Sequence, residues 1–206
     1  MTDKQFLDHA YGLDGYQKTK EFYTDWAESY DTEVTSNGYV TPARCADALL
    51  QFAPDKSLSI LDFGCGTGIS GAALAAEGFS NIIGTDLNDA MLSKARELKG
   101  VYKDVVLSDE ENSFDFEPGT YDCIAAIGVI GSGAAPVECF DSLMGCLAPD
   151  GLFVFSYNDH TLEDPAFEGR ISNYVDSGAA ELLFKEYGPH LPAREMNSNV
   201  YILKRR

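Results

Sequence analysis

Apolar residues along the chain alternate between short continuous runs and runs in which they recur every three or four positions. These are the patterns of buried strands and of helices. The strand pattern occupies 58–63, 81–86, 105–107, 121–127 and 151–157, and the helix pattern occupies 70–77, 88–98 and 136–147. Strands that alternate with helices predict a parallel, doubly wound α/β sheet.

The two ends of the chain depart from this alternation. Aromatic residues recur every four positions at Phe22, Trp26 and Tyr30, which predicts a helical segment from 4 to about 30 within an N-terminal part, 1–40, outside the sheet. Thr41 followed by Pro42 predicts the start of another helix, which continues through Leu50. At the other end, two strand-like runs at 182–186 and 200–204 predict an antiparallel pair within 180–206, joined by a loop with Gly188, Pro189 and Pro192.

Length and composition limit the architecture and the compartment. A chain of 206 residues with 45% apolar content predicts one domain, with the core of the sheet at 58–158. No run approaches the ~20 apolar residues of a membrane span, and no apolar stretch follows the first lysine. We therefore expect a cytoplasmic protein without a membrane partner. The five cysteines are odd in number and form no Cys-x-x-Cys pair, which predicts reduced thiols and no metal site.

The chain is strongly acidic. It has 33 acidic against 15 basic residues and a formal net charge of −18. Such a field repels a phosphate backbone, so we expect no nucleic-acid partner and a small-molecule substrate. The charge also has a plainer interpretation, a contribution to solubility, because net charge says nothing about the fold.

Candidate chemistry concentrates after the first strand, where Asp62 precedes Gly64, Gly66 and Gly68 and a helix follows. An open α/β sheet binds its ligand at this kind of turn, and glycines let the backbone come close to it. A glycine-rich turn alone is a weak signal, since it also occurs without a ligand. Asp86 ends the second strand 22 positions after Gly64, close to the spacing of about 20 at which an acid reaches the ribose hydroxyls of a nucleotide. The competing interpretation of Asp86 is a cap for the helix that begins near Asn88.

The spacing of the glycines distinguishes between two candidate cofactors. The motif is Gly-x-Gly-x-Gly, whereas the dinucleotide motif is Gly-x-Gly-x-x-Gly. Asp62 would repel a pyrophosphate but attract the ammonium and sulfonium groups of S-adenosylmethionine. S-adenosylmethionine is therefore favoured over NAD, and an NAD-linked oxidoreductase is kept as the weaker alternative.

The glycine motif with Asp62 and Asp86 resembles the cofactor motif of class I S-adenosylmethionine-dependent methyltransferases over about 58–158. The segment 22–31 further resembles small methyltransferase-like proteins of the Williams–Beuren region type. The resemblance implies a Rossmann-like seven-stranded sheet of order 3-2-1-4-5-7-6, with the last strand antiparallel and N-terminal helices as a lid.

The resemblance also implies which residues contact the cofactor. Asp62 would help to hold the amino group, Asp86 the ribose hydroxyls, and Asp109, or alternatively Glu110, the adenine amino group. The remaining expected cofactor contacts are Gly64, Gly66, Gly68, Leu87, Ile127 and Gly128, with Tyr23, Trp26 and Tyr30 from the lid. Aromatic lid residues would favour the sulfonium and exclude water, although such a stripe is equally typical of a helix docked on a core.

Fewer sequence features indicate how the methyl acceptor is bound. No Asn-Pro-Pro-Tyr or Asp-Pro-Pro-Tyr follows the fourth strand, and the nearly uncharged loop 128–135 predicts a small or apolar acceptor. His160, after the fifth strand, is the candidate base, although a single loop histidine is more often a solvated residue. Methyl transfer depends mainly on holding donor and acceptor in line, so an essential base need not exist. The sequence therefore predicts a methyltransferase, with a non-catalytic S-adenosylmethionine-binding protein as the second alternative.

Overall fold

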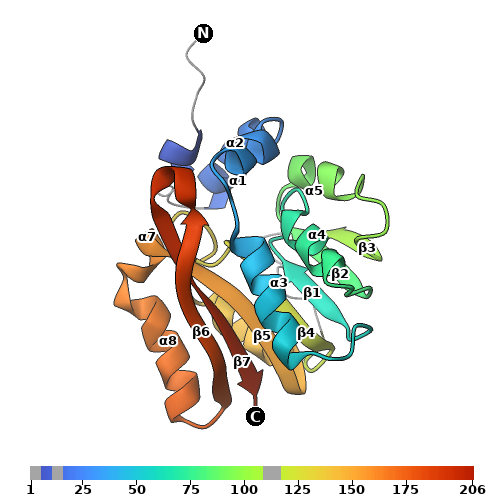
Figure 1. Cartoon of the computed structure of the whole chain (residues 1–206), viewed down its shortest axis with the longest axis vertical. Helices are drawn as coiled ribbons and strands as arrows, with labels where there is room; N and C mark the ends of the chain where they lie inside the picture. Colours follow the sequence, from blue (N-terminus) through green and yellow to red (C-terminus); the bar gives the residue numbers. More distant parts are fainter. Residues whose placement is uncertain (1–5, 11–15, 109–116) are drawn as a thin grey trace.

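The predicted strands form the centre of a seven-stranded sheet in the computed structural model, which describes residues 6–10, 16–108 and 117–206 (Figure 1). The strand order is β3-β2-β1-β4-β5-β7-β6, as the resemblance implies. β1 to β5 pair in parallel, and β7 is antiparallel to both of its neighbours. The strands are β1 (Ile60–Phe63), β2 (Ile82–Asp86), β3 (Asp104–Leu107), β4 (Tyr121–Ala126), β5 (Leu147–Asn158), β6 (Ala180–Leu191) and β7 (Met196–Arg205).

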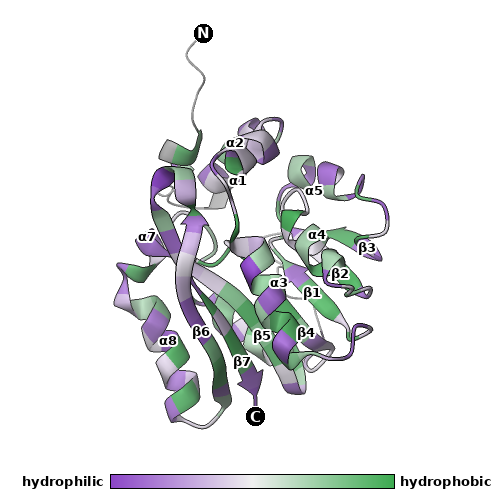
Figure 2. Ribbon diagram, viewed as in Figure 1, coloured by the Kyte–Doolittle hydropathy of each residue, from purple (hydrophilic) through white to green (hydrophobic). Residues whose placement is uncertain are grey.

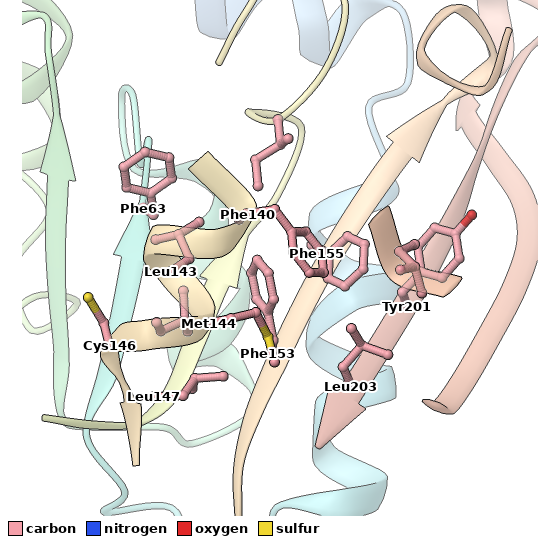
Figure 3. Close-up of a cluster of buried hydrophobic side chains, with 14 of the residues drawn as sticks. Phe63, Phe140, Leu143, Met144, Cys146, Leu147, Phe153, Phe155, Tyr201 and Leu203 are labelled. Carbon is pink, nitrogen blue, oxygen red and sulfur yellow. The ribbon is translucent and has the colours of Figure 1, made fainter. Parts of the chain in front are cut away.

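Helices cover both faces of the sheet. α3 and α4 pack on one face, where their apolar residues meet β1, β2 and β4, and α6 and α8 pack on the other. On the second face, Phe140 of α6 contacts the rings of Phe153 and Phe155 of β5 (Figure 3). The helices are α1 (Tyr16–Trp26), α2 (Tyr30–Ser36), α3 (Thr41–Phe52), α4 (Ile69–Ala76), α5 (Asp89–Ala95), α6 (Cys139–Cys146), α7 (Asp159–Leu162) and α8 (Pro165–Asp176), with short 3₁₀ helices at Phe6–Asp8 and Pro192–Arg194.

The central strands are mostly apolar, because helices cover both of their faces (Figure 2). β1 is buried at all four positions, whereas β3, at the edge of the sheet, is mostly exposed. The carboxyl ends of β1, β2, β4 and β5 meet at one edge, where α1 and α2 also lie (Figure 1). This edge is where an open α/β sheet binds its ligands. No helix of the described residues is long and apolar enough to cross a membrane.

Several elements differ from the sequence prediction. The single helix expected over 4–30 is two helices, α1 and α2, separated by a turn. The helix α8 was not predicted, although Asp164 caps it and Pro165 opens it, a recognisable start signal. The strand β6 continues through Pro189, which was expected to lie in a loop, because β6 is an edge strand and an edge position tolerates a residue without an N–H.

Candidate active site

The loop between β1 and α4 turns on three glycines in the left-handed region, with φ of +65° at Gly64, +56° at Gly66 and +97° at Gly68. A side chain is disfavoured at each of them for this reason alone. Their surroundings differ, however. A Cβ at Gly64 would lie 2.1 Å from Cγ2 of Val129, whereas a Cβ at Gly66 would meet no atom within 4 Å. The open space over Gly66 is where a cofactor can approach the backbone.

This contrast predicts different outcomes for two alanine variants. Gly64→Ala should lower the free energy of unfolding by about 1–3 kcal/mol more than Gly66→Ala, because only Gly64→Ala also overpacks against Val129. Gly66→Ala should retain the apo fold but bind S-adenosylhomocysteine at least tenfold more weakly. Urea unfolding and calorimetry measure the two effects. Equal stability of the two variants, with unchanged ligand affinity of Gly66→Ala, would contradict the assignment.

Asp86 lies at the end of β2 with its carboxylate against the glycine loop. Its Oδ2 accepts the N–H of Gly66 at 2.9 Å, and its Oδ1 accepts the N–H of Asn88 at 2.9 Å. Burial raises the pKa of Asp86, and these backbone hydrogen bonds act in the opposite direction. The cap of α5 is Asn88, whose side-chain oxygen accepts the N–H groups of Ala90 and Met91. Asp86 therefore does not occupy the capping position that was its alternative interpretation.

Asp62 is fully buried behind the loop rather than at its surface. Its Oδ2 accepts the hydroxyls of Ser70 and Tyr102, each at 2.7 Å, while its Oδ1 is buried without a hydrogen-bond partner. Burial raises the pKa of Asp62 to about 6, and the two hydroxyls oppose this shift. Of these residues, Ser70 lines the cavity in front of the loop. Asp62 can thus act on a ligand through Ser70 and through its field.

A cavity of about 620 Å³ opens in front of the loop, a size within the range of small-molecule sites. It brings together eight of the residues predicted to contact the cofactor: Tyr23, Tyr30, Gly64, Gly66, Asp86, Leu87, Ile127 and Gly128. Asp62, Gly68 and Trp26 do not line it, and Asp109 and Glu110 lie outside the described residues.

The candidate base lies apart from this cavity. His160 is in α7 and is not among the residues that line it. Sequence reasoning also missed several lining residues, of which Tyr39 and Met91 carry no recognisable signal. Ser70 and Thr67 could have been found, because they flank the last glycine of the motif.

The N-terminal helices close one side of the cavity. The hydroxyl of Thr67, in the glycine loop, donates to Asp31 of α2 at 2.5 Å. The side-chain amide of Asn88 donates to the carbonyl of Lys20 and to the hydroxyl of Thr24, both in α1 at 2.9 Å. Two loops that carry candidate cofactor residues therefore also bind α1 and α2, the two helices that we call the lid.

Trp26 belongs to the interior of this lid. It is 2% exposed, its indole N–H donates to Glu33, and its ring stacks on Tyr23. The rings that face the cavity are Tyr23 and Tyr30. The fluorescence of Trp26 can therefore report on ligand binding, because its ring contacts Tyr23 and Tyr30.

Loss of the contact between the loop and the lid should speed ligand release. Thr67→Val removes one hydrogen bond to a carboxylate, worth about 1.5–3 kcal/mol when buried and less here because Asp31 is half-buried. We expect S-adenosylhomocysteine to dissociate three- to tenfold faster, as measured by stopped-flow fluorescence of Trp26, the only tryptophan. Ser36→Ala, which removes a hydroxyl bonded only within α2, is the control. An unchanged dissociation rate would show that this contact does not hold the lid.

Comparison with known proteins identifies the family. A family model described as a methyltransferase domain matches residues 38–194. The chain belongs to this family. The predicted S-adenosylmethionine-dependent methyltransferase domain is confirmed, and the comparisons give no support to the NAD-linked alternative.

Two curated relatives illustrate the range of the family. Human methyltransferase-like protein 27 is 31% identical over 137 residues, 65% of this chain and 56% of that protein. Bovine 18S rRNA (guanine-N(7))-methyltransferase is 42% identical over 84 residues, 40% of this chain and 28% of that protein. The methyltransferase thus spans about half the length, or less, of these relatives.

Solved structures share the fold. The [4+2]-cyclase SpnF superposes with a TM-score of 0.69 at 13% identity, over 94% of this chain and 98% of that one. An S-adenosylmethionine-dependent methyltransferase from Mesorhizobium loti gives a TM-score of 0.57 at 18% identity, over 77% and 96%. At such identities the likeness establishes the Rossmann-like sheet, which hosts more than one reaction.

The comparisons correct the expected partners. Besides the bovine protein, relatives from Schizosaccharomyces pombe and Saccharomyces cerevisiae are named 18S rRNA guanine-N(7) methyltransferases. The expectation of a small-molecule substrate and no nucleic acid is therefore wrong. Its physical basis was insufficient, because net charge sums over the whole surface and does not describe the site where an acceptor binds.

The cavity fits S-adenosylmethionine. Asp86 would offer a carboxylate to the ribose hydroxyls, Gly66 leaves space for close approach, and Leu87 and Ile127 line the wall with apolar side chains. When bound, the cofactor supplies an electrophilic methyl group. The chain's own residues would hold the ligand, and Tyr23 and Tyr30, which line the cavity from α1 and α2, would help to exclude water from the site.

Proposed function

We propose that the methyltransferase transfers the methyl group to an unprotonated ring nitrogen of a nucleobase. The observation that carries this proposal is the scarcity of imidazole and carboxylate bases among the described residues that line the cavity. They include no histidine and one carboxylate, Asp86, both of whose oxygens already accept backbone N–H groups. Burial raises the pKa of the Cys139 thiol, which also lines the cavity, and so disfavours a thiolate.

An acceptor that keeps a free lone pair needs no base. A hydroxyl or a protonated amine must lose a proton during methylation, whereas a ring nitrogen such as guanine N7 is already a hydrogen-bond acceptor. The relatives named guanine-N(7) methyltransferases act on an atom of this kind. The rings of Tyr23, Tyr30 and Tyr39 around the cavity suit stacking on a flat base.

The proposed acceptor has to reach an acidic protein. A net charge of −18 slows approach of an RNA backbone, and salt screens this repulsion. We therefore expect the rate of association with RNA to rise between 20 and 150 mM salt, whereas association with an uncharged nucleoside should not change.

The test uses S-adenosylmethionine with a labelled methyl group. A structured RNA and guanosine are incubated separately with the protein, and the products are digested and separated to locate the label. Label on a ring nitrogen in either arm supports the proposal, and the arm that is labelled shows whether the base is presented in RNA. A labelled oxygen, or no labelled base in either arm, would overturn it.

The pH dependence supplies a second readout. If no proton has to leave the acceptor, kcat should vary less than twofold between pH 7 and 9. An acceptor that must be deprotonated would give a tenfold rise in kcat per pH unit below its pKa. Asp86→Ala, which should lose the cofactor, is the negative control for both measurements.

A further inference from the structure

A second, much smaller cavity adjoins the cofactor cavity at Gly128. It has a volume of about 30 Å³ and shares Tyr23, Gly128 and Ala134 with the larger one. We call it the recess. Its polar walls come from Ser156 and Asn158 at the end of β5, Thr161 of α7 and His190 of β6. A space of this size takes one water molecule or one polar atom of a ligand.

Asn158 presents a donor to the recess. Its Oδ1 accepts both the N–H and the hydroxyl of Thr161, each at 3.0 Å, as the cap of α7. Because the oxygen is used in this way, the amide orientation is fixed and the NH₂ group is the part that remains for a ligand.

His190 presents a second donor. Its Nδ1 lies 2.8 Å from the hydroxyl of Thr41, which lies 3.0 Å from the hydroxyl of Ser198. Arg44 donates to Ser198 at 3.1 Å and can only donate. The hydroxyl protons can run from Ser198 to Thr41 to Nδ1, and in that arrangement the ring proton is on Nε2.

The His190 ring is held neutral and in place. Burial lowers the pKa of His190 to about 4, so the ring carries a single N–H at neutral pH. Asp159, which raises that pKa, and Arg44 and His160, which lower it, are the charged and titratable groups that act on the ring. Tyr39 contacts the ring edge to face at a centroid distance of 5.1 Å, and Tyr39 also lines the cofactor cavity.

We propose that the recess binds a carbonyl oxygen of the methyl acceptor, next to the ring nitrogen that is methylated. Two donors that line a space for one atom favour an acceptor atom there, and an amino group in the same place would leave its N–H groups facing other donors. This inference rests on the proposed nucleobase acceptor. It narrows that proposal to a base such as guanine, in which O6 stands beside N7.

The experiment measures binding of three free bases to the protein saturated with S-adenosylhomocysteine. Hypoxanthine has a carbonyl at C6, adenine has an amino group there, and purine has neither. We expect hypoxanthine to bind about tenfold more tightly than purine, and adenine to bind most weakly. Isothermal calorimetry gives the three dissociation constants, and it needs no methyl transfer.

Asn158→Asp is the decisive variant because it exchanges the NH₂ group for an acceptor of the same shape while keeping the cap on Thr161. Its preference should reverse, with adenine binding more tightly than hypoxanthine. Asp164→Asn makes the opposite exchange at the cap of α8, away from the recess, and should keep the wild-type preference. His190→Asn, which retains an acceptor for Thr41 but lacks Nε2, should lose most of the preference and replaces Asn158→Asp if that variant does not fold.

Each outcome decides the inference. Equal binding of the three bases, no binding of any, or an unchanged preference in Asn158→Asp and His190→Asn would overturn it. If hypoxanthine is preferred but no base is methylated, the recess stands and the proposed function fails. If a ring nitrogen is methylated without any preference for the carbonyl, the proposed function stands and the recess fails.

Discussion

Asp86→Ala is expected to weaken binding of S-adenosylhomocysteine at least a hundredfold. Asp86 lines the cavity, and we expect its carboxylate to accept two ribose hydroxyls, each a hydrogen bond to a charged group worth about 1.5–3 kcal/mol. Loss of both corresponds to more than two decades in affinity at ~1.4 kcal/mol per decade. The variant also releases the N–H of Gly66, which the carboxylate holds at 2.9 Å, so the glycine loop loses a fixed point.

Two variants separate these contributions. Asp86→Asn keeps one acceptor oxygen and the shape of the side chain, and should retain part of the affinity. Asp89→Ala removes a neighbouring carboxylate that pairs with Arg96 on the surface, and should bind the ligand as the wild type does. If Asp86→Ala binds normally and is equally stable, the residue only organises the turn between β2 and α5.

The central part of the fold could be predicted because its signals are local. The apolar run before Gly64, the glycine spacing and the acid at the end of the next strand are each visible within a few residues. Backbone constraints then bring them together, since the carboxyl ends of adjacent parallel strands share one edge of the sheet. The order of the last two strands came instead from the family resemblance.

The lid shows why periodicity alone cannot assign a role. Phe22, Trp26 and Tyr30 lie on one helical stripe by spacing, but a turn separates α1 from α2 between Trp26 and Tyr30. Trp26 consequently packs among Phe6, Phe22 and Tyr23, while Tyr30 faces the cavity. The position of that turn decides which ring meets the ligand.

Tyr102 shows a contribution that sequence reasoning did not find. Its hydroxyl donates to Asp62, 40 positions earlier in the chain, and its ring fills space that glycines leave open. A Cβ at Gly71 would lie 2.2 Å from the Tyr102 hydroxyl oxygen, and one at Gly84 would lie 2.9 Å from the ring. These glycines lie outside the cofactor motif. Their role, which is to leave space for the Tyr102 side chain, can be recognised only from the packing of α4 and β2 against Tyr102.

Asp62→Asn is expected to stabilise the ligand-free protein at pH 8 while weakening its hold on the cofactor. Burial raises the pKa of the Asp62 carboxyl to about 6 in the folded protein, from an ordinary value of 3.8. A difference of about 2 units corresponds to about 3 kcal/mol, at 1.36 kcal/mol per unit, as an upper value. Because the folded-state pKa is raised, protonated Asp62 favours the folded state fully below pH 4, and this advantage is lost as the pH rises through 6.

The amide does not ionise, so the variant should gain up to about 3 kcal/mol of unfolding free energy at pH 8 and little at pH 4. Urea unfolding at the two pH values measures the gain. Asp141→Asn is the comparison variant, because Asp141 also accepts a tyrosine hydroxyl, from Tyr174, but is partly exposed, pairs with Arg170 and lies in α6 away from the glycine loop. It should show no gain at either pH.

The same variant should lose affinity for S-adenosylmethionine by tenfold or more, and by less for S-adenosylhomocysteine. The negative charge behind the loop attracts cationic groups in a site shielded from water, and only S-adenosylmethionine carries the sulfonium charge. Asp86 and the Cys65 and Tyr102 side chains are the other titratable groups close to Asp62, and they stay in place in the variant. Equal losses for the two ligands would show that Asp62 acts through the shape of the loop, and unchanged stability at pH 8 would show that its charge is already compensated in the ligand-free protein.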